Sequence, residues 1–178
     1  MSRSGYDDTE DHLAYGRWRQ AVNRALHGKR GQALLRELVQ ALDEMTDKRL
    51  YAGSFATAEG EFCMLGVLGA KRGTKMDDLG SAEDECDIKL VGQRFGIASA
   101  MAAEIMYMND EGSGNEWKFI DVEICGPVRP DWPDWGLHRR AERVPNVDHP
   151  SKRWVAVRKW AVGHLKSVNE RVENANCL

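Results

Sequence analysis

Several segments of the chain carry apolar residues at every third or fourth position, the spacing that places side chains on one face of an α-helix. The clearest one runs from about Gln32 to Met45, and its apolar stripe consists of Leu34, Leu35, Leu38, Leu42 and Met45. A second such segment, from about Leu13 to His27, precedes it. Because only Gly28 to Gly31 link the two segments, we expect an antiparallel pair of neighbouring helices, a helical hairpin.

Four more helices are expected further along the chain from the same spacing. Their approximate limits are Met64–Arg72, Ile88–Phe95, Ile97–Met108 and Ser151–Val172. Gly96 separates the helix at Ile88–Phe95 from the helix at Ile97–Met108. The small residue Gly92 lies four positions before Gly96, which favours close packing of these two helices. We therefore expect a tight helix corner whose core positions are Val91, Phe95, Ile97, Ala102 and Ile105.

Alternation of apolar and polar residues, the pattern of a half-buried strand, marks residues Trp117–Ile124. Short strands are also expected at Arg49–Ala52 and Glu61–Cys63. Residues 126–150 hold all five prolines and show no sustained period, which predicts an irregular excursion that contains tryptophan and proline.

These elements predict a predominantly helical α+β fold: a helical hairpin, a small two- or three-stranded sheet, a helix corner and a long C-terminal helix. Of the 178 residues, 42% are hydrophobic and 30% are charged, which is typical of a soluble globular protein. We expect residues 12–178 to form a single globular domain, because domains commonly contain about 100–200 residues. Residues 1–11 are polar and acidic, and we expect them to form a flexible arm.

The net charge of −3 disfavours a molecule that attracts polyanions by its total charge, and it leaves local patches open. No apolar run approaches the ~18 residues of a membrane span, and the N-terminus does not resemble a signal peptide. We therefore expect a cytoplasmic protein with no membrane partner.

No motif in the sequence points to a particular reaction. The cysteines have no paired spacing that would predict a zinc site, so we expect free thiols at Cys63, Cys86, Cys125 and Cys177. The glycine-rich segment Gly66–Lys75 does not fit a phosphate-binding loop. The best isolated carboxylate site is Asn109-Asp110-Glu111, for which a cap or a loop hydrogen bond is the ordinary explanation. We expect no catalytic residue, no metal and no cofactor; an enzyme remains an alternative that needs a histidine–carboxylate cluster brought together by the fold.

The helix corner around Gly96 has the geometry of a DNA-binding helix-turn-helix. Its second helix, however, contains no Arg, Lys, Asn or Gln at the positions that would read base edges. We therefore interpret the corner as a packing feature.

Basic residues are concentrated near the start of the chain, at Arg17, Arg19, Arg24, Lys29, Arg30 and Arg36, and again in the last helix. If the first and last helices adjoin, they form one positive face that binds nucleic acid or an acidic protein surface. For this hypothesis the candidate residues are Lys29, Arg30, Arg153 and Lys159. Solvated helix faces balanced by acidic segments are the other interpretation.

The segment from Pro127 to Arg140 places Trp132 and Trp135 among prolines, close to Arg139 and Arg140. Tryptophan and arginine dominate the energetics of protein interfaces, and a stiff loop loses little entropy when it binds. The tryptophans are therefore candidate anchors for a protein partner and the arginines its charged rim. Alternatively, both indoles fold back and seal the edge of the core.

Several short motifs resemble a family of small uncharacterised proteins encoded by bacteriophages and prophages of Gram-negative bacteria. They are Arg17-Trp18, Gly28–Leu35, Cys63–Gly69, Phe95–Ala98 and Asn109–Glu111. The resemblance covers about residues 2–111 and, more loosely, the last helix, and residues 126–150 are an addition to it. It implies expression in the cytoplasm of a bacterial host and an accessory role, such as inhibiting a host defence or redirecting a host machine. It assigns no active-site residue.

Three functional hypotheses follow. The first is a non-enzymatic phage accessory protein that binds a host protein through Trp132 and Trp135. The second is a protein that binds nucleic acid or a nucleoprotein through its basic helices, and the third is an enzyme whose site the sequence does not reveal.

Overall fold

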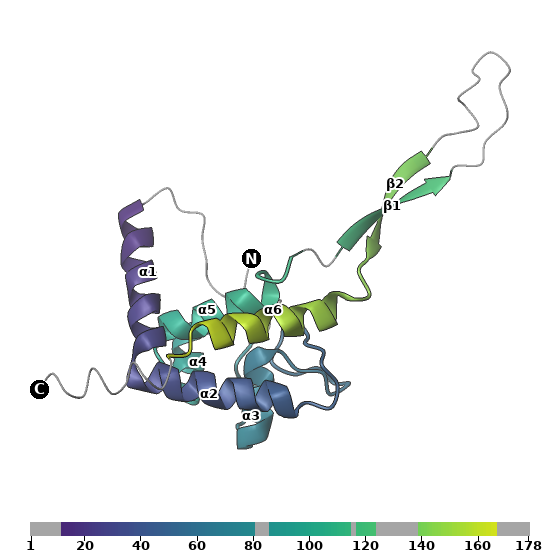
Figure 1. Cartoon of the computed structure of the whole chain (residues 1–178). Helices are drawn as coiled ribbons and strands as arrows, with labels where there is room; N and C mark the ends of the chain where they lie inside the picture. The colour runs from purple at the N-terminus through teal and green to yellow at the C-terminus, as the bar shows by residue number, and fades with distance from the viewer. Residues whose placement is uncertain (1–11, 81–85, 115–116, 124–138, 167–178) are drawn as a thin grey trace, which may run out of the picture. The chain divides into compact units, whose positions relative to one another are not determined.

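The computed structural model describes residues 12–80, 86–114, 117–123 and 139–166 (Figure 1). Contacts divide the chain into two compact units. We call Met1–Ser113 together with Pro150–Leu178 the helical unit, and Gly114–His149 the hairpin unit. The sequence analysis expected one domain over residues 12–178 with an excursion at 126–150, and the hairpin unit contains most of that excursion.

The described residues form six helices and one two-stranded antiparallel sheet, which confirms the expected mostly helical α+β class. In chain order the elements are α1 (His12–His27), α2 (Lys29–Glu44), α3 (Met64–Arg72), α4 (Ile88–Phe95), α5 (Ser99–Asp110), β1 (Trp117–Glu123), β2 (Arg139–Pro145) and α6 (His149–Gly163). All six expected helices are present. The last of them ends at Gly163, earlier than the spacing predicted, and the part of the expected helix after residue 166 lies outside the described residues.

The core of the helical unit is built around α5, which contacts α1, α3 and α4. No residue of α5 is exposed. The leucine stripe of α2 packs into the same core, and the largest fully buried side chains include Leu34, Leu35, Leu38, Leu42, Met101 and Ile105. α6 adds Val157 and Ala161, both with no exposed surface.

The corner between α4 and α5 forms as predicted. Gly96 adopts the left-handed conformation at φ 71°, and the Ile97 N–H donates to the Gly92 carbonyl at 2.8 Å. A Cβ on Gly92 would lie 3.0 Å from the Ile97 carbonyl oxygen, so the small residue is needed for the close approach. The five predicted core positions are all buried: Val91, Phe95, Ile97, Ala102 and Ile105.

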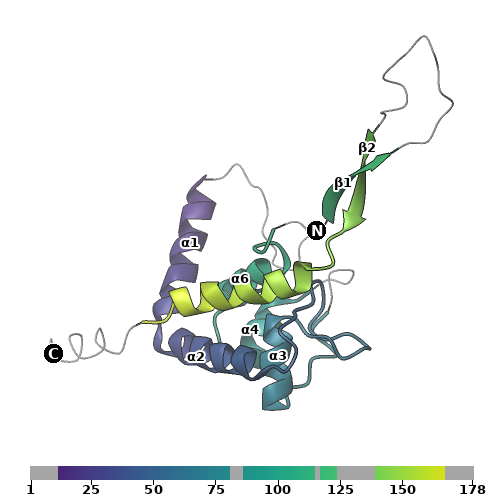
Figure 2. The same cartoon turned by 45° about the vertical axis from the view of Figure 1, so that its right-hand side comes forward.

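The first two helices are consecutive and in contact, but the expected antiparallel arrangement is not what the structure shows. In both views α1 is set across the end of α2 (Figures 1 and 2). The helices are joined through Gly28 alone, because α2 already begins at Lys29. A Cβ on Gly31 would lie 2.0 Å from the Ala25 carbonyl oxygen, so the first turn of α2 packs directly against the last turn of α1.

The antiparallel neighbour of α2 is α6. At one end the Gln32 side chain donates to the His164 carbonyl at 2.7 Å. At the other end the Trp154 indole donates to the Leu42 carbonyl at 3.3 Å, and Arg158 pairs with Asp43. These contacts place the two helices side by side with opposite directions, as Figures 1 and 2 show.

The hairpin unit contains β1 and β2, paired from Trp117 opposite Pro145 to Glu123 opposite Arg139. β1 confirms the predicted strand, whereas β2 falls in the segment expected to be irregular. The sequence of β2 lacks the alternation of apolar and polar residues that predicts a strand, so only its pairing with β1 identifies it. The expected strands at 49–52 and 61–63 do not form: Phe62 makes an isolated bridge with Ala56, which lies outside both segments, and accepts a hydrogen bond from the Tyr51 N–H at 2.9 Å.

Candidate functional site

The polar sequence at the end of α5 has a structural role. Asn109 is buried, its Oδ1 accepts the Met64 N–H at 2.9 Å, and its Nδ2 donates to the Tyr51 carbonyl at 2.8 Å. Asp110 Oδ1 accepts from Asn109 Nδ2 at 2.7 Å and from the Gly53 N–H at 3.3 Å. These side chains connect α5 to the start of α3 and to the preceding loop, which is the ordinary explanation that the sequence analysis gave for them.

The described cysteines are free thiols that bind main-chain groups. Cys63 is buried and caps α3, where its Sγ accepts the Gly66 N–H at 3.4 Å. Cys86 donates to the Leu79 carbonyl at 3.2 Å, and Cys125 and Cys177 lie outside the described residues. Over the part of the chain that the structure describes, no group of three or more His, Cys, Asp or Glu side chains is arranged to hold a metal ion.

Arg153 does not belong to the basic face to which the sequence analysis assigned it. Only 2% of this residue is exposed, and its Nη1 donates to the Leu50 carbonyl at 2.8 Å. It shares the buried face of α6 with Val157 and Ala161, at spacings of four residues. The neighbouring Trp154 also packs against the core, but it is only partly buried.

Other basic groups of the helical unit are neutralised by ion pairs. Arg158 donates to both carboxylate oxygens of Asp43, at 2.5 and 2.9 Å, and this hydrogen bonding lowers the pKa of Asp43. Three further pairs join Lys71 to Glu44, Arg72 to Glu37 and Arg94 to Asp78 at 2.6–2.8 Å. On α6, Lys159 is exposed as predicted.

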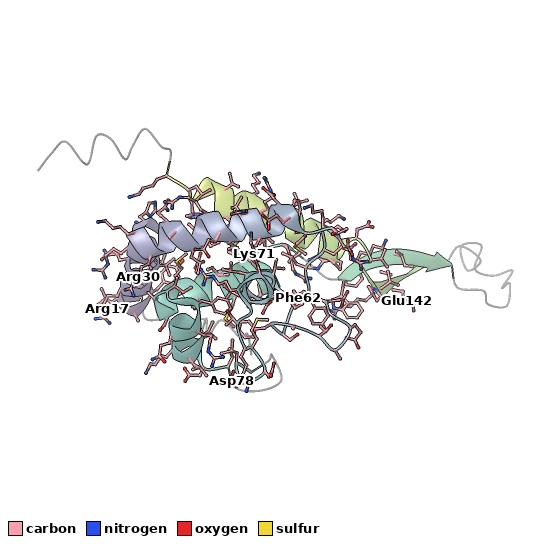
Figure 3. The ribbon with its side chains drawn as sticks, turned by 90° about the horizontal axis from the view of Figure 1, so that it is seen from below. Arg17, Arg30, Phe62, Lys71, Asp78 and Glu142 are labelled. Atoms are coloured by element: carbon pink, nitrogen blue, oxygen red, sulfur yellow. The ribbon has the colours of Figure 1, made fainter. Side chains whose placement is uncertain are left out.

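A row of exposed polar and basic side chains remains on α1 and at the start of α2. We call it the basic stripe: Arg17, Gln20, Arg24 and His27 on α1, followed by Lys29 and Arg30. The α1 members are spaced three or four residues apart and therefore share one helix face. Within the described residues, Arg17, Arg24, Lys29 and Arg30 make no ion pair. Arg17 and Arg30 lie at the same end of the helical unit (Figure 3).

Gln32 holds three helix ends together beside the basic stripe. Its Nε2 donates to the Leu26 carbonyl at 2.9 Å and to the His164 carbonyl at 2.7 Å, while its Oε1 accepts the Lys166 N–H at 2.9 Å. The side chain is only 4% exposed. The C-terminal ends of α1 and α6 therefore meet at Gln32. The unpaired basic side chains, however, lie mainly on α1 and α2.

The hairpin unit carries an exposed aromatic face that the sequence analysis did not identify. Trp117 and Phe119 alternate along β1 and are 43% and 72% exposed. Arg143 pairs opposite Phe119, and its guanidinium lies 4.6 Å from the centre of the Trp117 ring. We call these three residues the aromatic face. The sequence did contain a signal for this face. Trp117 and Phe119 alternate along the strand, and they occupy the opposite side from Ile120 and Val122 of the predicted strand.

The predicted partner-binding residues are only partly described. Trp132 and Trp135 lie in the segment between β1 and β2, outside the described residues. Arg139 and Arg140 belong to β2, where their main chains pair with Glu123 and Val122, and their side chains are not described. Their proposed roles stay predictions.

No helix within the described ranges combines the length and the apolar character needed to cross a bilayer. Comparisons of the chain with protein-family models, with curated proteins and with solved structures found no match.

Proposed function

We propose that the protein is a non-enzymatic binding protein that attaches to another protein through its hairpin unit and thereby inhibits or redirects that protein. The observation that supports this proposal best is the aromatic face, on which Trp117, Phe119 and Arg143 occupy adjacent positions of a two-stranded sheet.

Covering the aromatic face is energetically favourable. Complete burial of a side chain such as Phe119 contributes about 1.5–3 kcal/mol, and a two-stranded sheet gains stability when another layer packs against it. Aromatic and arginine side chains are also the residues that most often dominate binding energy. The partner that fits this face offers an apolar surface with a carboxylate near Arg143.

Trp132 and Trp135, with Arg139 and Arg140, belong to the same unit of the chain. We propose that they extend the contact, with the tryptophans as anchors. Consistent with the phage resemblance, the proposed partner is a protein of the bacterial host cytoplasm, and the proposed role is an accessory one such as inhibition of a host defence.

The test is affinity capture from a lysate of a Gram-negative host, with and without nuclease, followed by titration of the purified partner against the protein. The proposal expects one stoichiometric partner that resists nuclease and binds Phe119→Ala about 10–30-fold more weakly, as for a central interface residue. Val155→Ala is the matched control, because Val155 is a 58% exposed apolar residue on α6 of the helical unit.

Circular dichroism and thermal unfolding first establish that both variants are folded. A partner that binds Phe119→Ala and the wild type equally well would exclude the aromatic face as its site. Recovery that disappears with nuclease would show that nucleic acid, and not a protein, had been captured.

A further inference from the structure

We infer that the basic stripe is a binding surface for double-stranded DNA, with α1 as the helix that contacts it. This inference is independent of the hairpin unit, because all the residues that carry it lie in the helical unit.

Positive charge is segregated in this part of the chain. Residues 12–36 contain six Arg or Lys residues and no Asp or Glu, although the whole chain has a net charge of −3. Elsewhere in the helical unit, Glu37, Asp43, Glu44 and Asp78 each pair with a basic side chain. A row of like charges without partners is complementary to a phosphate backbone, and binding releases the counterions that the nucleic acid holds.

The exposure of α1 agrees with such a role. Its buried residues, Val22 and Leu26, lie in its second half, whereas Leu13, Tyr15 and Arg17 in its first half are exposed. Within the helical unit, both ribbon views show α1 leading away from its junction with α2 (Figures 1 and 2). An α-helix with its side chains is about 10–12 Å wide, close to the ~12 Å of the major groove of B-DNA.

The residue types of the stripe suit this partner. Arginine and lysine bind phosphates, and arginine, glutamine and asparagine also donate hydrogen bonds to base edges. Arg17, Gln20 and Arg24 present these groups, and the neighbouring Asn23 is exposed as well. The second helix of the α4–α5 corner offers no comparable surface, because none of its residues is exposed.

The experiment measures binding of the full chain to fluorescent duplex DNA and duplex RNA of about 20 base pairs, at salt concentrations from about 50 to 200 mM. The full chain is used so that the acidic residues before α1 are present: Asp7, Asp8, Glu10 and Asp11. The test variant is Arg17→Glu/Arg24→Glu. The control is Arg49→Glu/Lys89→Glu, which makes the same change in net charge at two exposed positions of the helical unit outside the basic stripe and outside α6.

We expect binding to the DNA duplex that weakens steeply with salt, and weaker binding to the RNA duplex, whose deep and narrow major groove does not admit a helix. The α1 variant should bind at least about tenfold more weakly, with a salt slope lower by about two, while the Arg49→Glu/Lys89→Glu control stays within about threefold of the wild type. The inference is overturned if the DNA duplex does not bind at the lowest salt concentration, if the RNA duplex binds more tightly than the DNA duplex, or if both variants weaken binding equally. If the α1 variant fails to fold, Arg17→Gln/Arg24→Gln replaces it and Arg49→Gln/Lys89→Gln becomes its control, with the same expected order of affinities.

Discussion

The helical unit and the hairpin unit treat large apolar side chains in opposite ways. In the helical unit Leu35 and Leu38 have no exposed surface, whereas in the hairpin unit Phe119 is 72% exposed and Trp117 43% exposed. The helical unit has several elements that pack around α5, but the hairpin unit is built on a two-stranded sheet. Large apolar side chains thus form a core in one region and an open face in the other, because burial depends on a second packing layer.

The largest expected effect tests this contrast directly. Leu35→Ala should lower the free energy of unfolding by about 2–5 kcal/mol, because it removes buried methyl groups and leaves a cavity. Phe119→Ala should change the stability of the helical unit by no more than about 0.5 kcal/mol, as for an exposed position. Urea unfolding followed by the helical circular dichroism signal measures both. A loss for Phe119→Ala as large as that for Leu35→Ala would remove the distinction between the two regions.

A smaller effect concerns how tightly the helical unit is packed where α1 meets α2. A Cβ on Gly31 would lie 2.0 Å from the Ala25 carbonyl oxygen, so Gly31→Ala should destabilise the protein by about 1–3 kcal/mol. Gly16 is a matched control, because it also lies in a helix but has no atom within 4 Å of the added Cβ. Gly16→Ala should stabilise the protein by about 0.5–1 kcal/mol. Melting temperatures that shift in the same direction for both variants would contradict this packing.

The smallest effect concerns surface charge in the helical unit. Since hydrogen bonding from Arg158 lowers the pKa of Asp43, the pair contributes stability above the ordinary aspartate pKa and loses it as pH falls through the lowered value. Both side chains are partly exposed, so the contribution is small. Asp43→Asn should therefore lower the urea midpoint slightly at about pH 7 and not at about pH 2.

Asp47→Asn is the control for the loss of one negative charge, because Asp47 is exposed and lies just after the end of α2. An equal difference between Asp43→Asn and the wild type at both pH values would show that the ion pair is not its cause.

The sequence predicted the features that depend on neighbouring residues. Helical spacing located α2 and α3 to within a few residues, and Gly96 marked the end of α4 because a residue without a Cβ adopts the left-handed conformation at little cost. The candidate sites were predicted less completely. The basic segment was found, but the sequence could not show that α1 and the start of α2 would present its unpaired charges, and the exposure of Trp117 and Phe119 depends on what packs against β1.

By itself, then, the sequence determined the helices, the glycine-dependent corner and the clustering of positive charge near the start of the chain. Tertiary structure decided that α6 and not α1 is the antiparallel neighbour of α2, that β2 forms, and that Arg153 is buried. Each of these depends on groups far apart in the chain: Arg153, for example, donates to the carbonyl of Leu50, 103 residues earlier. Local spacing reports the conformation of a segment, whereas the partner that covers it is fixed only when the whole chain packs.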